Sequence, residues 1–178
     1  MDISNNSIIT NIVISGGSVA GLTFYGAIKQ LSIQGSWDIQ NIKTIYSASV
    51  GSILSLIIAL KYDWEETDEF LIKRPWHKVF RLDVSSLLNA INNLGVFDVN
   101  VFHEAFDPLL LGKGLEPSTT LKEFYEYSNI ECHIMCTKLD SMQLIDVSYK
   151  THPDMNLITA IFCSCSVPIV FKPYYYID

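Results

Sequence analysis

The chain has 178 residues, which is enough for one domain with a hydrophobic core and short for two. With 49% apolar and 17% charged residues, its composition is that of a folded globular chain and excludes a disordered one. The formal net charge of −7 argues against a nucleic-acid partner, because nucleic acids are bound by clustered lysine and arginine.

Signals for export or membrane insertion are lacking in the sequence. The first ten residues, MDISNNSIIT, are polar and do not have the basic and long apolar regions of a signal peptide. The longest apolar run, Ile53 to Leu60 with Ser55 inside it, is too short to cross a bilayer. We therefore expect a soluble cytoplasmic protein without a transmembrane segment.

Two strand–helix pairs are predicted in the first third of the chain. Residues 7–17 (SIITNIVISGG) are a β-branched apolar run that ends in two glycines, which is typical of a strand. Residues 19–35 then place apolar side chains at helical spacing, with Gly35 as the stop. A second strand over 41–47 (NIKTIYS) precedes an apolar helix over 50–62. This order predicts right-handed crossovers and a parallel, buried sheet.

The middle of the chain, about residues 62–128, is predicted to be a helical insertion. Short amphipathic helices are expected over 63–83 and 87–106. Thr120, with Glu123 three residues later, forms a capping-box pattern that predicts the start of a further helix.

The last part of the chain is predicted to return to the sheet. Residues 130–139 and 142–149 indicate two strands joined by a turn near Asp140. A short helix is expected over 156–165, and residues 167–178 are expected to be extended because they contain two prolines.

Four cysteines occur in this last part, and their spacing matches no common zinc site. None of the four histidines completes such a site, so no metal is expected. We predict reduced, buried thiols, with the first two on one face of a strand. The residues are Cys132, Cys136, Cys163 and Cys165.

The glycine-rich turn SGGSVAG, residues 15–21, lies between a predicted strand and a predicted helix. A dinucleotide-binding turn would need glycine where Ser18 stands, and an acidic residue after the second strand, where none is found. A phosphate-binding P-loop would need lysine at the position of Leu22. Two interpretations stay open. In one, backbone N–H groups of Gly16, Gly17 and Ser18 form an oxyanion hole; in the other, the turn binds nothing.

A second turn, Ser47-Ala48-Ser49-Val50-Gly51, also joins a predicted strand to a predicted helix. It approximates the G-x-S-x-G nucleophile elbow, in which the central serine is exposed on a strained turn between small neighbours. The alternative is that serines merely fill a crowded turn. Ser49 is the candidate nucleophile.

Together these segments resemble the patatin-like phospholipase family. The similarity lies in SGGSVAGLTFYGAIKQL, IYSASVGSILSLIIAL and AIFCSCSVPIVFKPYYYID, in this order and context. The resemblance implies one domain over 1–178 with an α/β fold, in which helices flank a mainly parallel central sheet. It also implies lipid acyl-ester hydrolysis by a Ser–Asp dyad, without metal or cofactor.

The sequence departs from the family pattern at several positions. Ala20 stands where the family has a basic residue, Ser18 replaces a loop glycine, and Ser47 replaces the first elbow glycine. The family's D-G-G or D-G-A motif is absent. Asp178 is therefore either the dyad base or a turn residue, in which case the chain is C-terminally incomplete. Asp140 resembles the family's structural turn Asp and is a poor candidate for the base.

A basic and aromatic segment and the histidines are further candidates for a function. The segment LIKRPWHKVFRL combines four cations with two aromatic residues and is either a patch for an anionic membrane surface or a solvated helix face. A Ser–His arrangement also stays open. The four cations and two aromatic residues of the segment are Lys73, Arg74, Lys78, Arg81, Trp76 and Phe80.

We therefore expect a lipid acyl hydrolase, of the phospholipase A or lipase type, that works through an acyl-enzyme. Ser49 and Asp178 are its catalytic candidates, and a lipid or phospholipid with transient membrane-surface contact is its expected partner. The alternative is a catalytically inactive lipid- or protein-binding module with the same fold. The sequence makes no prediction about the oligomeric state.

Overall fold

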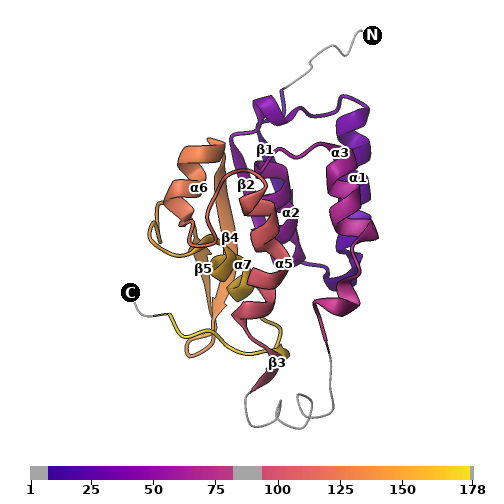
Figure 1. The fold of residues 1–178 in the computed structure, drawn as a ribbon. Helices are drawn as coiled ribbons and strands as arrows, with labels where there is room; N and C mark the ends of the chain where they lie inside the picture. The colour runs from indigo at the N-terminus through magenta and orange to yellow at the C-terminus, as the bar shows by residue number, and fades with distance from the viewer. Residues whose placement is uncertain (1–7, 82–93, 177–178) are drawn as a thin grey trace.

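The centre of the molecule is a four-stranded sheet with strand order β1-β2-β4-β5 (Figure 1). This computed structural model describes residues 8–81 and 94–176. The strands β1 (Asn11–Ile14), β2 (Thr44–Ala48) and β4 (Glu131–Lys138) are parallel, and β5 (Gln143–Val147) is antiparallel to β4. The predicted mainly parallel sheet flanked by helices is confirmed.

The helices that connect these strands begin and end close to where the sequence predicts. Helix α1 (Gly21–Ile33) joins β1 to β2, and α2 (Val50–Ala59) follows β2. Gly35, two residues beyond α1, has φ +73°, a conformation that glycine adopts without strain. Helix α7 (Leu157–Cys165) follows β5. The short turns η1 (Ser18–Ala20) and η2 (Ile39–Asn41) complete this part.

The middle segment contains mostly short helices. They are α3 (Trp64–Asp68), η3 (Glu69–Lys73), η4 (Trp76–Lys78), α5 (Val99–Leu111) and α6 (Leu121–Ser128). The capping box is confirmed at Thr120, whose side chain accepts from the Glu123 N–H while the Glu123 carboxylate accepts from the Thr120 N–H. No helix within 8–81 and 94–176 is both long and apolar enough to span a membrane.

One strand in this segment contradicts the prediction of a helix over 87–106. Strand β3 (Gly95–Phe97) pairs in parallel with β6 (Ile169–Phe171), and residues 82–93 lie outside the described residues. A Cβ atom on Gly95 would lie 2.4 Å from the Phe171 carbonyl carbon, so the two backbones meet only because Gly95 has no side chain. This pairing partner is distant in sequence, which local periodicity does not reveal.

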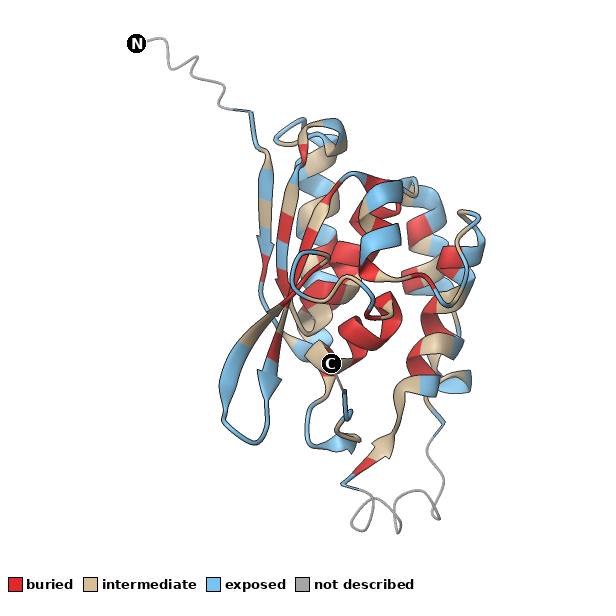
Figure 2. Cartoon of the chain, turned by 90° about the vertical axis from the view of Figure 1, so that its left-hand side faces the viewer, coloured by how far each residue is buried: buried red, intermediate tan, exposed pale blue. Residues whose placement is uncertain are grey.

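The described helices cover one face of the sheet. Helix α2 packs on β1 and β2, and α7 packs on β4. The strand residues on this face, Ile14, Ile45, Ile134 and Val147, are all buried. On the opposite face Val13, Tyr46 and Leu144 are exposed by 78%, 40% and 73%. Figure 2 shows the strands at one side of the described helices. The prediction of a buried sheet is therefore right for one face of the described strands and wrong for the other.

The order of the strands explains this arrangement. From β1 to β2 to β4 the chain steps across the sheet in a single direction. Right-handed crossovers that step in the same direction place their helices on the same face.

Aromatic side chains join the helical layer to β6. The Phe102 ring of α5 meets the rings of Phe162 in α7 and Phe171 in β6 edge to face, at 5.2 and 5.5 Å between centroids. Phe97 of β3 lies 6.0 Å from Phe171. These contacts anchor the β3–β6 pair to the end of α7.

The four cysteines are free thiols, as predicted. Cys132 and Cys136 lie on the helix-covered face of β4, and both are buried. Burial raises the pKa of Cys132 from an ordinary 9.0 to about 11. It raises the pKa of Cys136, Cys163 and Cys165 to about 12.

These buried thiols predict a loss of stability at alkaline pH. Because the folded pKa values are raised, the stabilisation is present below pH 9.0 and is lost as the pH rises toward 12. Between pH 8 and pH 10 we expect each thiol to lower the free energy of unfolding by about 1.4 kcal/mol. Urea unfolding under reducing conditions measures this fall. In Cys136→Ala the fall should be smaller by that amount, and an unchanged fall would contradict the prediction.

Candidate active site

Ser49 lies at the turn between β2 and α2, at the edge of the sheet where the parallel strands end. Its backbone has φ 52° and ψ −127°, in the left-handed region that a non-glycine residue rarely adopts. The residue is half-buried. This strained strand–turn–helix geometry is what the elbow pattern predicts for a serine with an accessible hydroxyl.

Two glycines allow the turn to pack against the end of β1. A Cβ on Gly51 would lie 2.4 Å from the Ile14 carbonyl oxygen, so only glycine fits at this elbow position. A Cβ on Gly16 would lie 3.3 Å from the Cβ of Ser49. The glycine-rich turn and the serine turn, about thirty residues apart in sequence, therefore meet. Such contact is required if one turn supplies the oxyanion hole and the other the nucleophile of the same site.

Ser47 occupies the other position where the elbow pattern has glycine. Its side chain is buried, and its hydroxyl donates to the backbone carbonyl of His133 at 3.2 Å. The neighbouring strand β4 thus satisfies the polar group, which lets a serine stand there without an unpaired buried hydroxyl.

The glycine-rich turn lies beside Ser49 at Gly16. Ser18 has φ 49°, and the carbonyl of Gly17 accepts from the Ala20 N–H at 2.9 Å. In the described part of the chain, no loop hydrogen bond uses the N–H of Gly16, Gly17 or Ser18. Such N–H groups at the start of a helix can bind a negatively charged oxygen.

Ser164 of α7 contacts the turn at Ser49, and it was not predicted from the sequence. Its hydroxyl accepts from the Ser49 N–H at 2.8 Å and donates to the Met135 carbonyl of β4 at 2.7 Å. The Ser52 hydroxyl lies 3.2 Å from it. Ser164 therefore ties the elbow to α7 and β4. A single serine between two cysteines carries no local signal for this role.

Cys165, the residue after Ser164, lies against the Ser49 side chain. Burial raises the pKa of its thiol to about 12, and a hydrogen bond with Ser49 only partly offsets this effect. The thiol is therefore neutral at ordinary pH and cannot take a proton from Ser49 as a base.

Within 8–81 and 94–176, no carboxylate is hydrogen-bonded to the Ser49 hydroxyl. Asp140 lies in the turn between β4 and β5, with its side chain 70% exposed and paired with Lys138 at 3.6 Å. Asp178, the predicted base, lies outside the described residues.

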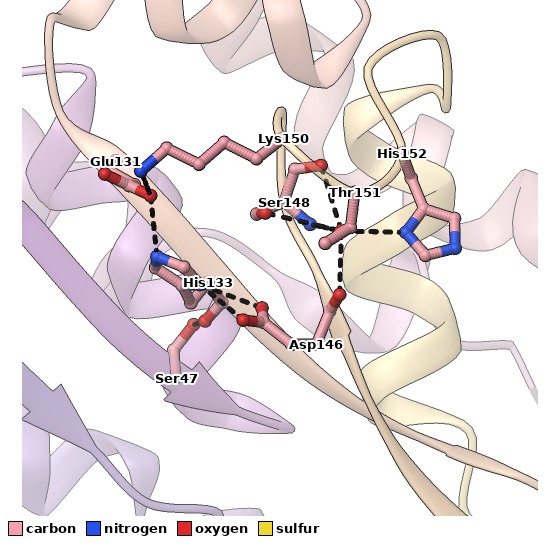
Figure 3. Close-up of polar contacts among 8 residues, drawn as sticks. All are labelled: Ser47, Glu131, His133, Asp146, Ser148, Lys150, Thr151 and His152. Carbon is pink, nitrogen blue, oxygen red and sulfur yellow. Dashed lines mark hydrogen bonds and ion pairs between the residues drawn. The ribbon is translucent and has the colours of Figure 1, made fainter.

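His133 belongs to a separate polar cluster on β4 and β5 (Figure 3). Its Nδ1 lies 2.7 Å from the Asp146 carboxylate and its Nε2 lies 3.0 Å from that of Glu131. Lys150 pairs with the same Glu131 at 2.5 Å, and Tyr46 stacks on the imidazole at 4.4 Å. Both ring nitrogens are therefore engaged away from Ser49.

The other histidines are also placed elsewhere. His103 bonds to Asp107 in α5, His152 bonds to the Thr151 hydroxyl (Figure 3), and His77 is exposed on η4. None of the described hydrogen bonds of a histidine reaches Ser49, so the geometry does not favour a Ser–His pair.

Comparisons with known proteins identify the family to which this chain is similar. A family model described as "Patatin-like phospholipase" matches residues 12–178. The chain is 26% identical over 165 residues to "Probable lipid hydrolase 463L" of Invertebrate iridescent virus 6, covering 93% of this chain and 56% of that protein. It is also 26% identical over 176 residues to "Triacylglycerol lipase ptl3" of Schizosaccharomyces pombe, covering 92% and 34%.

A solved structure shows the same fold. VipD from Legionella pneumophila superposes with a TM-score of 0.65 at 16% identity, covering 94% of this chain and 44% of that one. The chain spans about half the length of the viral lipid hydrolase that it matches.

Proposed function

This chain belongs to the patatin-like phospholipase family, and from that premise we propose that it hydrolyses carboxylic esters of lipids with Ser49 as the nucleophile. The observation that carries the proposal is the turn at Ser49. There a serine with φ 52° meets the glycine-rich turn at Gly16, and a helix begins directly after it. A serine so placed is exposed to a substrate and lies beside N–H groups that can hold an anion.

The proposed reaction follows from these positions. The Ser49 hydroxyl oxygen attacks the carbonyl carbon of the ester while a base takes its proton. Backbone N–H groups of Gly16, Gly17 and Ser18 then hold the negative oxygen of the tetrahedral intermediate. Collapse of the intermediate releases the alcohol, which takes up a proton, and leaves an acyl group on Ser49. Water hydrolyses this ester, and no step uses a metal or cofactor.

Two side chains and the start of a helix have different proposed parts in this reaction. We propose Asp178 as the base, because the family resemblance implies a Ser–Asp dyad and the Cys165 thiol is too weak a base. Ser164 is a positioning residue: it holds the Ser49 N–H at 2.8 Å, so that N–H is not available to the oxyanion. The start of α2 adds a favourable partial positive charge at the site.

A binding module with the same fold is the second candidate function. Two observations favour it: Ala20 and Ser18 depart from the family's oxyanion-loop pattern, and no carboxylate of the described segments is hydrogen-bonded to Ser49. Such a module would hold a lipid or a protein without cleaving an ester.

A fluorophosphonate probe separates the two candidates, because it reacts only with an activated serine. We expect the folded chain to form one adduct, which mass spectrometry of the digested protein places on Ser49 and not on Ser47, Ser52 or Ser164. The urea-unfolded chain is the control and should form no adduct. The hydrolase proposal fails if the folded chain stays unlabelled, or if labelling is equal in urea.

A further inference from the structure

Exposed apolar side chains occur in the segments next to the two turns of the candidate site. Val19 in η1 and Leu22 at the start of α1 are exposed by 91% and 56%. Beyond α7 and beside β6, further apolar side chains are exposed by 43% to 77%. We call this set the apolar rim; its members are Val19, Leu22, Leu94, Val167, Ile169 and Val170.

Both halves of the rim are continuous with the candidate active site. Val19 lies in the glycine-rich turn that contacts Ser49 through Gly16. Val167 comes three residues after Ser164, whose hydroxyl accepts from the Ser49 N–H at 2.8 Å, and the Val167 N–H donates to the Cys165 carbonyl at 2.7 Å. The start of α1 and the β3 ribbon lie toward the same end of the molecule (Figure 1). The rim residues therefore lie close in sequence to the two segments that contact Ser49.

The backbone at two rim positions is strained. Ile169 has φ 76° and Leu94 has φ 59°. Ile169 is the first residue of β6 and pairs with Gly95, and Leu94 directly precedes Gly95 in the chain. The left-handed region is strained for a β-branched residue, and Ile169 is nevertheless 77% exposed. A large apolar side chain held in water at such a cost indicates a surface that meets an apolar partner.

Two cations lie beside the rim. Phe80 packs edge to face on Phe97 of β3 at 5.6 Å, which brings Lys78 and Arg81 close to the β3–β6 pair. Both are exposed, and neither forms an ion pair with a carboxylate of the described residues. Apolar side chains next to cations complement a membrane surface with anionic headgroups.

The remaining cations of the predicted basic patch are engaged elsewhere. Lys73 pairs with Glu69. Arg74 donates to the carbonyls of Glu104 and Ala105 and lies over the Phe70 ring. The patch proposed from the sequence is thus reduced to its last two cations.

We propose that the apolar rim, with Lys78 and Arg81 beside it, docks this chain on a lipid–water interface that carries anionic phospholipid. A lipid ester would then move from the interface to Ser49 without crossing water. The proposal rests on the proposed function for its substrate, but the docking itself requires no hydrolysis.

The test measures vesicle binding in a Ser49→Ala background, where no hydrolysis can alter the vesicles. Cosedimentation with phosphatidylcholine–phosphatidylglycerol vesicles gives the apparent Kd. Adding Val19→Asp and Ile169→Asp should weaken binding at least about tenfold. Aspartate tolerates positive φ, so the change at Ile169 preserves the fold, which circular dichroism verifies.

Ile33→Asp is the matched control. Ile33 is 60% exposed on the same helix as Leu22 but eleven residues further along, about 16 Å away along the axis. Its replacement should leave the apparent Kd unchanged. Lys78→Gln with Arg81→Gln should reduce the preference for vesicles with phosphatidylglycerol over vesicles of phosphatidylcholine alone.

Three outcomes would overturn the docking proposal. They are absence of vesicle binding by the folded Ser49→Ala chain, equal binding after the rim changes, and equal weakening by Ile33→Asp. A rim that binds a protein instead of lipid would give the first or second result. If the vesicle test fails but the fluorophosphonate probe labels Ser49, the hydrolase proposal is still supported. If vesicle binding depends on the rim but the probe does not label Ser49, only the docking proposal is supported.

Discussion

Replacement of Ser49 by alanine is expected to lower the rate of lipid-ester hydrolysis by about 10⁴-fold or more, because it removes the attacking oxygen. The fold should be retained, since the backbone N–H that bonds to Ser164 is still present. Initial rates with a short-chain soluble ester and with a phospholipid, measured on protein of unchanged thermal stability, give the size of the effect.

Ser166→Ala is the matched control for this prediction. The Ser166 hydroxyl lies nearby, at the end of α7, and donates only to the Phe162 carbonyl at 2.7 Å. Its removal should change the rate less than about threefold. If the Ser49→Ala protein kept more than about a hundredth of the rate, another group would be the nucleophile.

Replacement of Gly51 by alanine is expected to destabilise the protein by about 3 kcal/mol and to abolish hydrolysis. The new Cβ would lie 2.4 Å from the Ile14 carbonyl oxygen and 2.9 Å from that of Ser15. Both contacts are with backbone, so α2 and β1 must move apart and the turn at Ser49 moves with them. Urea unfolding measures the stability, and probe labelling measures the site.

Gly26→Ala tests whether the effect comes from the contact of the new Cβ with the β1 backbone and not from the loss of a glycine in a helix. Gly26 lies inside α1, and a Cβ there would meet nothing within 4 Å. The same substitution should therefore stabilise the protein by about 0.5–1 kcal/mol, because alanine is the better helix former. Equal effects at the two glycines would contradict the packing argument.

The sequence predicted the two turns of the candidate site, but it did not predict the side chain that joins the serine turn to α7 and β4. The two turns, at Gly16 and Ser49, were each predicted from small residues between a strand and a helix, and the structure brings them into contact. Their chemical roles stay predictions. Ser164 was not predicted, because its contacts with Ser49 and Met135 join residues 115 and 29 positions apart. Asp178 lies outside the described residues, and its role as the base is still a proposal.

By itself the sequence determined the elements whose causes are local. Apolar periodicity predicted α1, α2 and α7; β-branched runs predicted β1, β2, β4 and β5; and the capping box at Thr120 predicted the start of α6. These features depend on residues within one or two turns of each other, so a short window of sequence contains the whole cause.

Only the tertiary structure decided the remaining features. It showed that β3 pairs with β6 and that the described helices cover a single face of the sheet. It also showed that, within the predicted basic patch, Lys73 and Arg74 are engaged by other groups, whereas Lys78 and Arg81 are exposed and form no ion pair with a described carboxylate. Each of these depends on which distant segments pack together. That choice is made by the direction of the crossovers and by the fit of side chains across the core, neither of which a local pattern contains.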